Sequence, residues 1–111
     1  MAEADCLFCK IVAGEVPATM VHEDAQVVAF RDVDPQAPTH LLVIPREHHA
    51  DAGALAAADG DLLAAVLRVA TEVAAAEGLD ESGYRLVANK GPNGGQTVFH
   101  AHVHVLGGRR M

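Results

Sequence analysis

The stretch His100-Ala101-His102-Val103-His104-Val105-Leu106 alternates histidine with apolar residues near the C-terminus. This is the period of a β-strand, in which successive side chains point to opposite faces. The three histidines are therefore expected to line one face of a strand, while Ala101, Val103 and Val105 pack into a core. Next-but-one residues of an extended strand lie roughly 6.5 Å apart, so three imidazoles would stand in a row on a rigid element.

Imidazole titrates near neutrality and can act as base, acid, nucleophile or metal ligand. Seven histidines in 111 residues leave open a chance triplet with a structural role. A metal site made of the three histidines alone is a second alternative, because His-x-His is a common ligand spacing on strands. Catalysis by the middle histidine, His102, is the third, and the neighbouring residues favour it.

Composition and charge limit the classes of protein to which the chain can belong. Its 111 residues suffice for one domain with a real core, and we expect a single domain over residues 1–111. The formal net charge of −7 argues against non-specific binding to nucleic acid or an anionic membrane. No stretch approaches the ~18 apolar residues of a membrane span, and the first residues do not resemble a signal peptide. We therefore expect a cytoplasmic protein.

Hydrophobic periodicity predicts one long helix, one short helix and five strands. The long helix is expected over 60–76, after a single helical turn at 55–58, and the short helix over 6–13. These elements indicate an α+β fold with a five-stranded antiparallel sheet. One face of the sheet takes the long helix, so the histidine row lies on the other face or at its edge. The strands are expected at 19–23, 27–31, 40–45, 84–89 and 98–106.

A glycine-rich loop, Gly91-Pro-Asn-Gly-Gly-Gln-Thr97, leads directly into the histidine strand. Glycines let the backbone approach a ligand and expose N–H groups to oxyanions. Alone, the loop is equally well explained as a tight turn between strands. Next to three histidines, an anion-binding role for the loop is favoured, because attack on phosphorus needs hydrogen-bond donors to an anion beside an imidazole nucleophile.

Two cysteines stand near the N-terminus as Cys6-Leu-Phe-Cys9. A structural disulfide is not expected in a reducing compartment. A thioredoxin-like redox pair is disfavoured, because no strand precedes the two cysteines. Half of a zinc site is the better interpretation, provided that two more ligands come from elsewhere in the chain.

The sequence resembles the histidine triad family of nucleotide hydrolases and transferases, and within it the Hint-like branch. Residues 100–106 match the family's His-φ-His-φ-His-φ-φ signature. The resemblance implies the α+β fold already expected, in a homodimer whose fourth strands and long helices form a continuous ten-stranded sheet. Further similar segments cover nearly the whole chain, at 7–12, 23–24, 29–30, 32–45, 84–89, 94–97 and 106–109.

The resemblance also implies a reaction. His102 would attack the α-phosphorus of a purine nucleoside 5′-phosphoramidate, forming a covalent nucleotidyl-histidine from which water releases the nucleoside monophosphate. Its Nδ1–H would be donated to the backbone carbonyl of His100, and His104 would contact a phosphate oxygen. Thr97 would help to protonate the departing amine. His40 would join the triad in a proton network, although a buried histidine at a strand start is an alternative.

A nucleotide pocket follows from the same resemblance. Asp32 matches the acidic residue that holds the ribose hydroxyls, as a carboxylate can by accepting two hydrogen bonds. The wall of the base pocket would consist of residues that also fit ordinary core positions, namely Phe8, Phe30, Val33 and Leu42. The phosphate side would be formed by Asn89, Gly95 and Gln96.

Zinc-bearing members of the family suggest how the cysteines are used. They carry Cys-x-x-Cys near the N-terminus, a histidine after the third strand, and the first triad histidine. Here these would be Cys6, Cys9, His48 and His100, with His49 as the competing third ligand. A Cys₂His₂ set would be a closed structural site that ties the N-terminal helix to the catalytic strand, and the chemistry would require no metal.

Two other functions stay open beside a small-molecule nucleotide hydrolase. One is a dinucleoside polyphosphate hydrolase, which the Hint-like loop 32–40 disfavours. The other is a non-catalytic, zinc- and nucleotide-binding regulatory protein. Hint enzymes usually continue with a Trp-Pro-Pro-like tail that shapes leaving-group specificity, whereas this sequence stops at Met111. The chemistry is expected to survive without the tail, and the resemblance does not fix the substrate preference.

Overall fold

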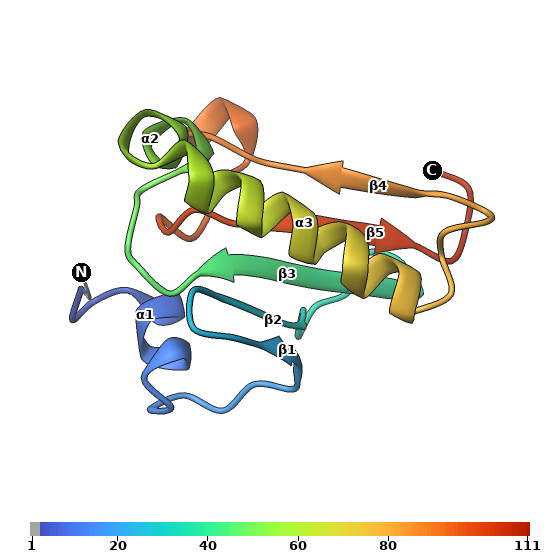
Figure 1. Cartoon of the computed structure of the whole chain (residues 1–111), viewed down its shortest axis with the longest axis horizontal. Helices are drawn as coiled ribbons and strands as arrows, with labels where there is room; N and C mark the ends of the chain where they lie inside the picture. Colours follow the sequence, from blue (N-terminus) through green and yellow to red (C-terminus); the bar gives the residue numbers. More distant parts are fainter. Residues whose placement is uncertain (1–2) are drawn as a thin grey trace.

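A five-stranded antiparallel sheet in the order β1-β2-β3-β5-β4 forms the frame of the molecule (Figure 1). The computed structural model describes residues 3–111. The predicted α+β fold is confirmed. Its strands are β1 (Met20–Glu23), β2 (Val27–Arg31), β3 (Thr39–Pro45), β4 (Tyr84–Val87) and β5 (Val103–Gly107), and its helices are α1 (Leu7–Val12), α2 (Ala52–Ala58) and α3 (Gly60–Ala76), with a 3₁₀ turn, η1, at Pro92–Gly94.

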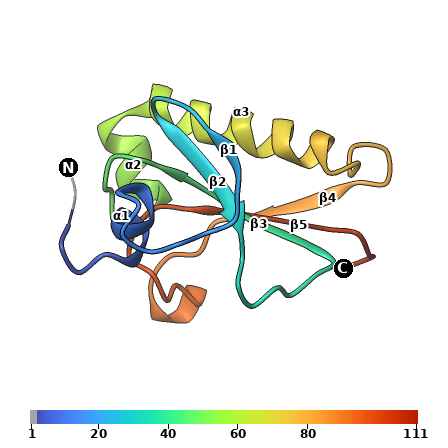
Figure 2. The same cartoon turned by 90° about the horizontal axis from the view of Figure 1, so that it is seen from below.

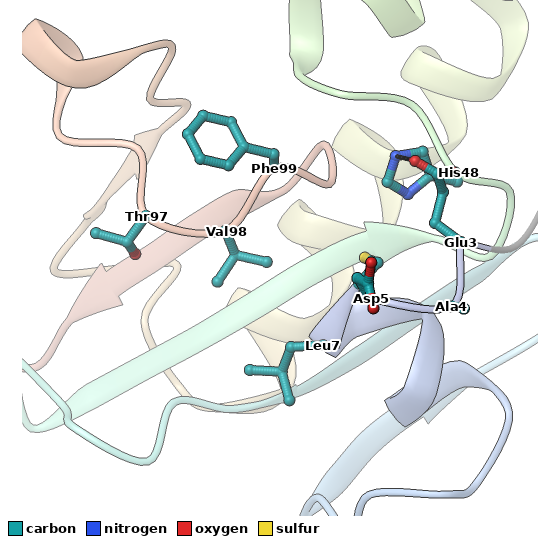
Figure 3. A pocket seen from close by; sticks show the side chains of 9 residues that line it. Glu3, Ala4, Asp5, Leu7, His48, Thr97, Val98 and Phe99 are labelled. Carbon is teal, nitrogen blue, oxygen red and sulfur yellow. Dashed lines mark ion pairs between the residues drawn. The ribbon is translucent and has the colours of Figure 1, made fainter.

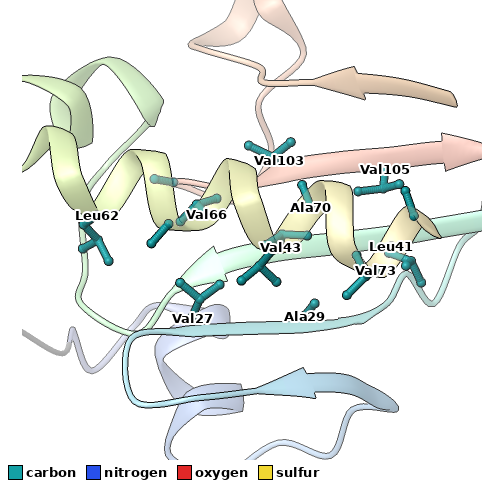
Figure 4. Close-up of a cluster of buried hydrophobic side chains, with 14 of the residues drawn as sticks. Val27, Ala29, Leu41, Val43, Leu62, Val66, Ala70, Val73, Val103 and Val105 are labelled. Atoms are coloured by element: carbon teal, nitrogen blue, oxygen red, sulfur yellow. The ribbon is translucent and has the colours of Figure 1, made fainter. Parts of the chain in front are cut away.

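Helix α3 covers one face of the sheet (Figure 4). Asp59 begins the helix, because its Oδ1 accepts a hydrogen bond from the Leu62 amide at 3.0 Å. Apolar residues recur at spacings of three and four along α3, and its buried side chains pack against β2, β3 and β5. Val103 and Val105 lie in this core together with Ala101, as the alternating pattern predicts. No helix within residues 3–111 is long and apolar enough to cross a membrane.

Helix α1 packs on the opposite face of the sheet (Figure 2). Phe8 and Ile11 lie against Phe30, Leu42 and further apolar residues of β2 and β3. The Phe8 and Phe30 rings meet edge to face, with centroids 5.5 Å apart. This second, smaller core holds α1 beside the histidine row.

The fifth strand is shorter than the alternating pattern predicts. It begins at Val103 rather than at residue 98, so His100 and His102 precede the hydrogen-bonded ladder. The physical reason is a competing partner: the Ala101 amide donates to the His49 carbonyl at 2.6 Å. Helix α2 is longer than the single turn predicted, because the Asp51 side chain caps it by accepting from the Ala54 amide at 2.9 Å.

Candidate active site and metal centre

The three triad histidines lie on the sheet face opposite α3. His104 belongs to β5 and pairs with Leu42 of β3, whereas His100 and His102 lie in the extended segment before the strand. The rings of His102 and His104 have centroids 5.0 Å apart, and the Phe8 ring stands edge-on 5.1 Å from His102. His100 and His102 are buried and the Phe8 ring of α1 packs against both, whereas His104 is half-buried.

The hydrogen bond of His102 determines where its proton lies. Its Nδ1 is 2.7 Å from the His100 carbonyl oxygen, and a carbonyl can only accept. Nδ1 therefore carries the hydrogen and Nε2 carries the lone pair. Burial lowers the pKa of His102, so the neutral ring prevails near pH 7. His102 thus offers an available basic nitrogen.

The neighbouring ring carries its proton on the opposite nitrogen. The Gln36 amide donates to His40 Nδ1 at 3.1 Å, so the His40 hydrogen sits on Nε2. That Nε2 lies 2.9 Å from His104 Nδ1, which must accept. His104 therefore carries its hydrogen on Nε2, and burial lowers its pKa to about 4. His102 and His104 present an acceptor and a donor side by side.

A cleft of about 300 Å³ lies in front of these rings. His102, His104 and Thr97 line it together with Asp32, whose Oδ2 is 3.4 Å from His40 Nε2. The structure therefore brings the predicted ribose ligand and Thr97 to the triad. The predicted base-pocket residues also line this cleft, namely Phe8, Phe30, Val33 and Leu42.

The residues expected on the phosphate side instead stabilise the structure of the glycine-rich loop. The Asn89 side-chain Nδ2–H donates to the Gly94 carbonyl at 2.6 Å, and Gly95 adopts a φ of +77°, which favours glycine. The buried Gln96 side chain accepts from the Gly91 amide at 3.0 Å and donates to the carbonyls of Ala50 and Val98. The described lining of the cleft includes none of Asn89, Gly95 and Gln96.

Cys6, Cys9, His48 and His100 form a compact cluster beneath the N-terminal segment. Their sulfur and Nδ1 donor atoms lie within 4.8 Å of one another. His100 Nδ1 is 3.3 Å from Cys6 Sγ, 3.5 Å from Cys9 Sγ and 3.2 Å from His48 Nδ1. His49 lies outside the cluster, because its Nε2 contacts Glu47 Oε1 at 2.8 Å.

This donor set fits a tetrahedral zinc ion. Zn–S bonds of about 2.3 Å and Zn–N bonds of about 2.05 Å imply S···N edges of about 3.6 Å and N···N edges of about 3.4 Å. The edges at His100 are within a few tenths of an ångström of these lengths. The His100 Nε2–H donates to the Pro45 carbonyl at 2.8 Å, which leaves the Nδ1 lone pair facing the cluster.

A second cleft of about 630 Å³ adjoins the first (Figure 3). The two clefts share Leu7, Thr97 and Val98, so Thr97 stands between them. Glu3 and His48 lie on one side of the second cleft, and Thr97, Val98 and the exposed Phe99 lie across from them. Sequence reasoning missed this cleft, because its two sides come from opposite ends of the chain.

Residues 13–111 match the family model described as the HIT domain. The chain belongs to the HIT family. It is 44% identical to the purine nucleoside phosphoramidase of Escherichia coli K12 over all of this chain and 92% of that protein. It is 49% identical to a 14 kDa zinc-binding protein of Zea mays, over 98% of this chain and 86% of the maize protein. A HIT family hydrolase from Clostridium thermocellum superposes with a TM-score of 0.95 at 43% identity, covering 99% of this chain and 96% of that one.

Proposed function

We propose that this chain hydrolyses the phosphorus–nitrogen bond of purine nucleoside 5′-phosphoramidates through a nucleotidyl-His102 intermediate. The single observation that carries the proposal is the pair of opposite tautomers in the cleft. His102 Nε2 is an acceptor because Nδ1 donates to a carbonyl, and His104 Nε2 is a donor because Nδ1 accepts from His40. Attack on phosphorus needs both a nucleophile and a donor to the phosphoryl oxygens. The name of the E. coli relative supports the choice of substrate.

In the first step, the His102 Nε2 lone pair forms a bond to the α-phosphorus and the phosphorus–nitrogen bond breaks. The departing amine takes a proton, and Thr97 stands where it can help to deliver it. His104 Nε2–H donates to a phosphoryl oxygen as charge develops. In the second step a water oxygen forms a bond to phosphorus, the bond from phosphorus to His102 Nε2 breaks, and its electron pair returns to Nε2. The water loses a proton to solvent, and the nucleoside monophosphate leaves.

Recognition of the nucleotide is assigned to the cleft in front of the triad. We propose that the Asp32 carboxylate accepts from the ribose hydroxyls and that the apolar wall of Phe8, Phe30, Val33 and Leu42 holds the base. Asn89, Gly95 and Gln96 would contribute by shaping the loop on the phosphate side. The leaving amine would pass Thr97 toward the second cleft, which adjoins there.

The decisive experiment compares adenosine 5′-phosphoramidate hydrolysis by the wild type and by His102→Ala. Loss of the nucleophile should lower kcat by at least about 10³-fold. Acid-quenched wild type should carry a nucleotidyl adduct by intact mass, and His102→Ala should carry none. His22→Ala is the matched control, because His22 lies at the edge strand β1 and contacts Asp24 instead. Activity that persists in His102→Ala would refute the mechanism.

Three further assays on the same proteins, with a diadenosine polyphosphate, with AMP and with a chelator, separate the alternatives. A dinucleoside polyphosphate hydrolase would turn over a diadenosine polyphosphate much faster than the phosphoramidate. A regulatory protein would bind AMP without turnover, and replacing His102 would change nothing. A metalloenzyme with zinc at the three histidines would lose all activity on chelation, whereas the proposed mechanism keeps residual turnover.

We propose that Cys6, Cys9, His48 and His100 hold one structural zinc ion. The fit of the donor distances supports this, as does the name of the maize relative. Thiolate ligands must stay reduced, which agrees with a cytoplasmic location. Elemental analysis should give about one zinc per chain for the wild type and for His49→Ala, but a greatly lowered content for His48→Ala. Equal zinc in the two variants would contradict the ligand assignment.

We also propose that two copies pair through β4 and α3. β4 is the last strand of the sheet and pairs with β5 on one side, so its other edge is free to extend the sheet within residues 3–111. Leu86 on β4 and Leu67 on α3 are exposed apolar side chains. Sedimentation should give the mass of a dimer for the wild type and a shift toward monomer for Leu86→Arg. A wild-type monomer at micromolar concentration would refute the pairing.

A further inference from the structure

The peptide unit that joins His100 to Ala101 is fixed on every side. Its carbonyl accepts the His102 Nδ1–H at 2.7 Å, and its amide donates to the His49 carbonyl at 2.6 Å. The His100 ring on the same residue is fully buried, and its Nε2–H donates to the Pro45 carbonyl at 2.8 Å. The remaining ring atom, Nδ1, faces Cys6, Cys9 and His48.

The hydrogen bonds of the sheet do not hold this peptide unit in place. The last ladder pair of β3 and β5 joins Val43 and Val103, so His102 stands just outside the strand. Its position depends on what holds the residues before it. The Cys/His cluster is an anchor there beside the carbonyls of His49 and Pro45, because it contacts the side chain of the residue whose carbonyl orients the His102 ring.

We propose that Cys6, Cys9 and His48 are positioning residues for the nucleophile, acting through the His100 ring and carbonyl. The inference rests on the proposed function and deepens it. The cluster then does more than join α1 to the sheet: it holds the one acceptor that keeps the His102 proton on Nδ1. Without the cluster the His100 residue is held at fewer points, so its backbone torsions have more freedom. Its carbonyl can then move away from His102 Nδ1, and His102 loses the partner that distinguishes its two nitrogens.

The expected kinetic signature is a loss of kcat without a loss of binding. The cluster lies beside the nucleotide cleft and shares no residue with its described lining. Substrate affinity should therefore stay within twofold. The chemical step should slow about 10-fold or more, as is typical when a partner behind a ligating or reacting histidine is removed. A variant that only lowered the folded fraction would also lower the apparent kcat at unchanged KM, so the tautomer of His102 in the folded protein is the readout that separates the two cases.

Cys6→Ser is the sharpest variant. Cys6 caps α1, with its Sγ accepting from the Cys9 amide at 3.3 Å, and a serine hydroxyl caps equally well. The substitution therefore keeps the helix start and removes one thiolate. Val12→Ala is the matched control, because Val12 packs from α1 into the smaller core and is not one of the four residues of the cluster. Wild-type protein stripped with a chelator and reloaded with Zn²⁺ gives a second perturbation that changes no residue.

Three readouts are measured on each sample: zinc content, kcat and KM, and the ¹⁵N histidine spectrum, with His102 assigned by its loss in His102→Gln. The zinc-loaded wild type and Val12→Ala should show His102 protonated on Nδ1 alone. Cys6→Ser and the stripped wild type should show His102 signals averaged between tautomers, with kcat lowered about 10-fold, and Zn²⁺ should restore the stripped sample.

A metal-free sample that keeps a single Nδ1–H tautomer and a kcat within twofold of wild type would overturn the inference. If the wild type fails to hydrolyse any phosphoramidate, the proposed function fails instead. The tautomer readout would still decide whether the cluster positions His102.

Discussion

Gln96 closes the glycine-rich loop and links it to the segment before α2, and replacing it should destabilise the free protein. Its side chain makes three hydrogen bonds of 2.8 to 3.1 Å, to Gly91, Ala50 and Val98. Each is worth about 1 kcal/mol, so Gln96→Ala should lower the free energy of unfolding by about 2–3 kcal/mol. At about 2.1 cal/mol/K per residue, this lowers Tm by roughly 10 °C for a chain of this length.

Gln96→Glu tests the two hydrogen bonds that the Gln96 side chain donates. The introduced carboxylate would put oxygen against two carbonyl oxygens, so its pKa should be raised in the folded state. A raised folded pKa contributes stability below the ordinary value near 4.3, and that stability is lost as pH rises through the raised value. Relative to wild type at the same pH, the variant should therefore be more destabilised at pH 8 than at pH 4.5.

Urea unfolding followed by circular dichroism measures both effects, and Gln26→Ala is the control, because it makes the same change at an exposed position. If Gln96 serves the nucleotide directly rather than through the loop, Gln96→Ala will keep its stability within 0.5 kcal/mol and lose only AMP affinity. That result would refute the reasoning.

Three further substitutions test the frame of the fold. Asp24→Ala removes a side chain that accepts from two backbone amides of the β1–β2 turn and should cost about 1 kcal/mol in urea melts, with Asp24→Asn much closer to wild type. The hydrogen bond from His22 lowers the pKa of Asp24 to about 2, so its stabilisation is complete above pH ~4 and lost as pH falls toward 2, which NMR titration checks. Gly107→Ala would place a Cβ 2.6 Å from Leu79 and should destabilise by about 1–3 kcal/mol, part of which Leu79→Ala in the same chain recovers. Leu41→Ala empties a fully buried site and should cost about 2–5 kcal/mol by thermal melting.

Local sequence patterns predict which helices and strands form, but they do not predict where each one begins or ends. The 3.6-residue period of α3 and the alternation of β5 are properties of consecutive residues, so both were predictable. The start of β5 at Val103 was not, because the competing acceptor for the Ala101 amide is a carbonyl 52 residues earlier in the chain, at His49. The alternation of apolar residues and histidine runs through 99–102, although the hydrogen-bonded ladder does not.

The choice between His48 and His49 shows the same limit. Adjacent residues differ by only one position in their spacing to Cys6 and Cys9, so the sequence left both histidines as candidate ligands. The turn after β3 decides, because it points the His48 ring at the cluster and the His49 ring at Glu47. That direction depends on φ and ψ at a few loop residues, which composition does not determine.

The three triad histidines have different chemical roles, although their side chains are identical. The hydrogen-bond partners of the two ring nitrogens determine the role of each. His100 faces a carbonyl with Nε2 and the Cys/His cluster with Nδ1, so neither nitrogen is free. His104 accepts at Nδ1 and can only donate at Nε2. His102 alone donates at Nδ1 and keeps a lone pair at Nε2 in the cleft. The period of the strand places the rings, but the backbone carbonyls of Pro45 and His100 and the amide of Gln36 assign their roles, which is why a nucleophile at the middle position requires the surrounding fold.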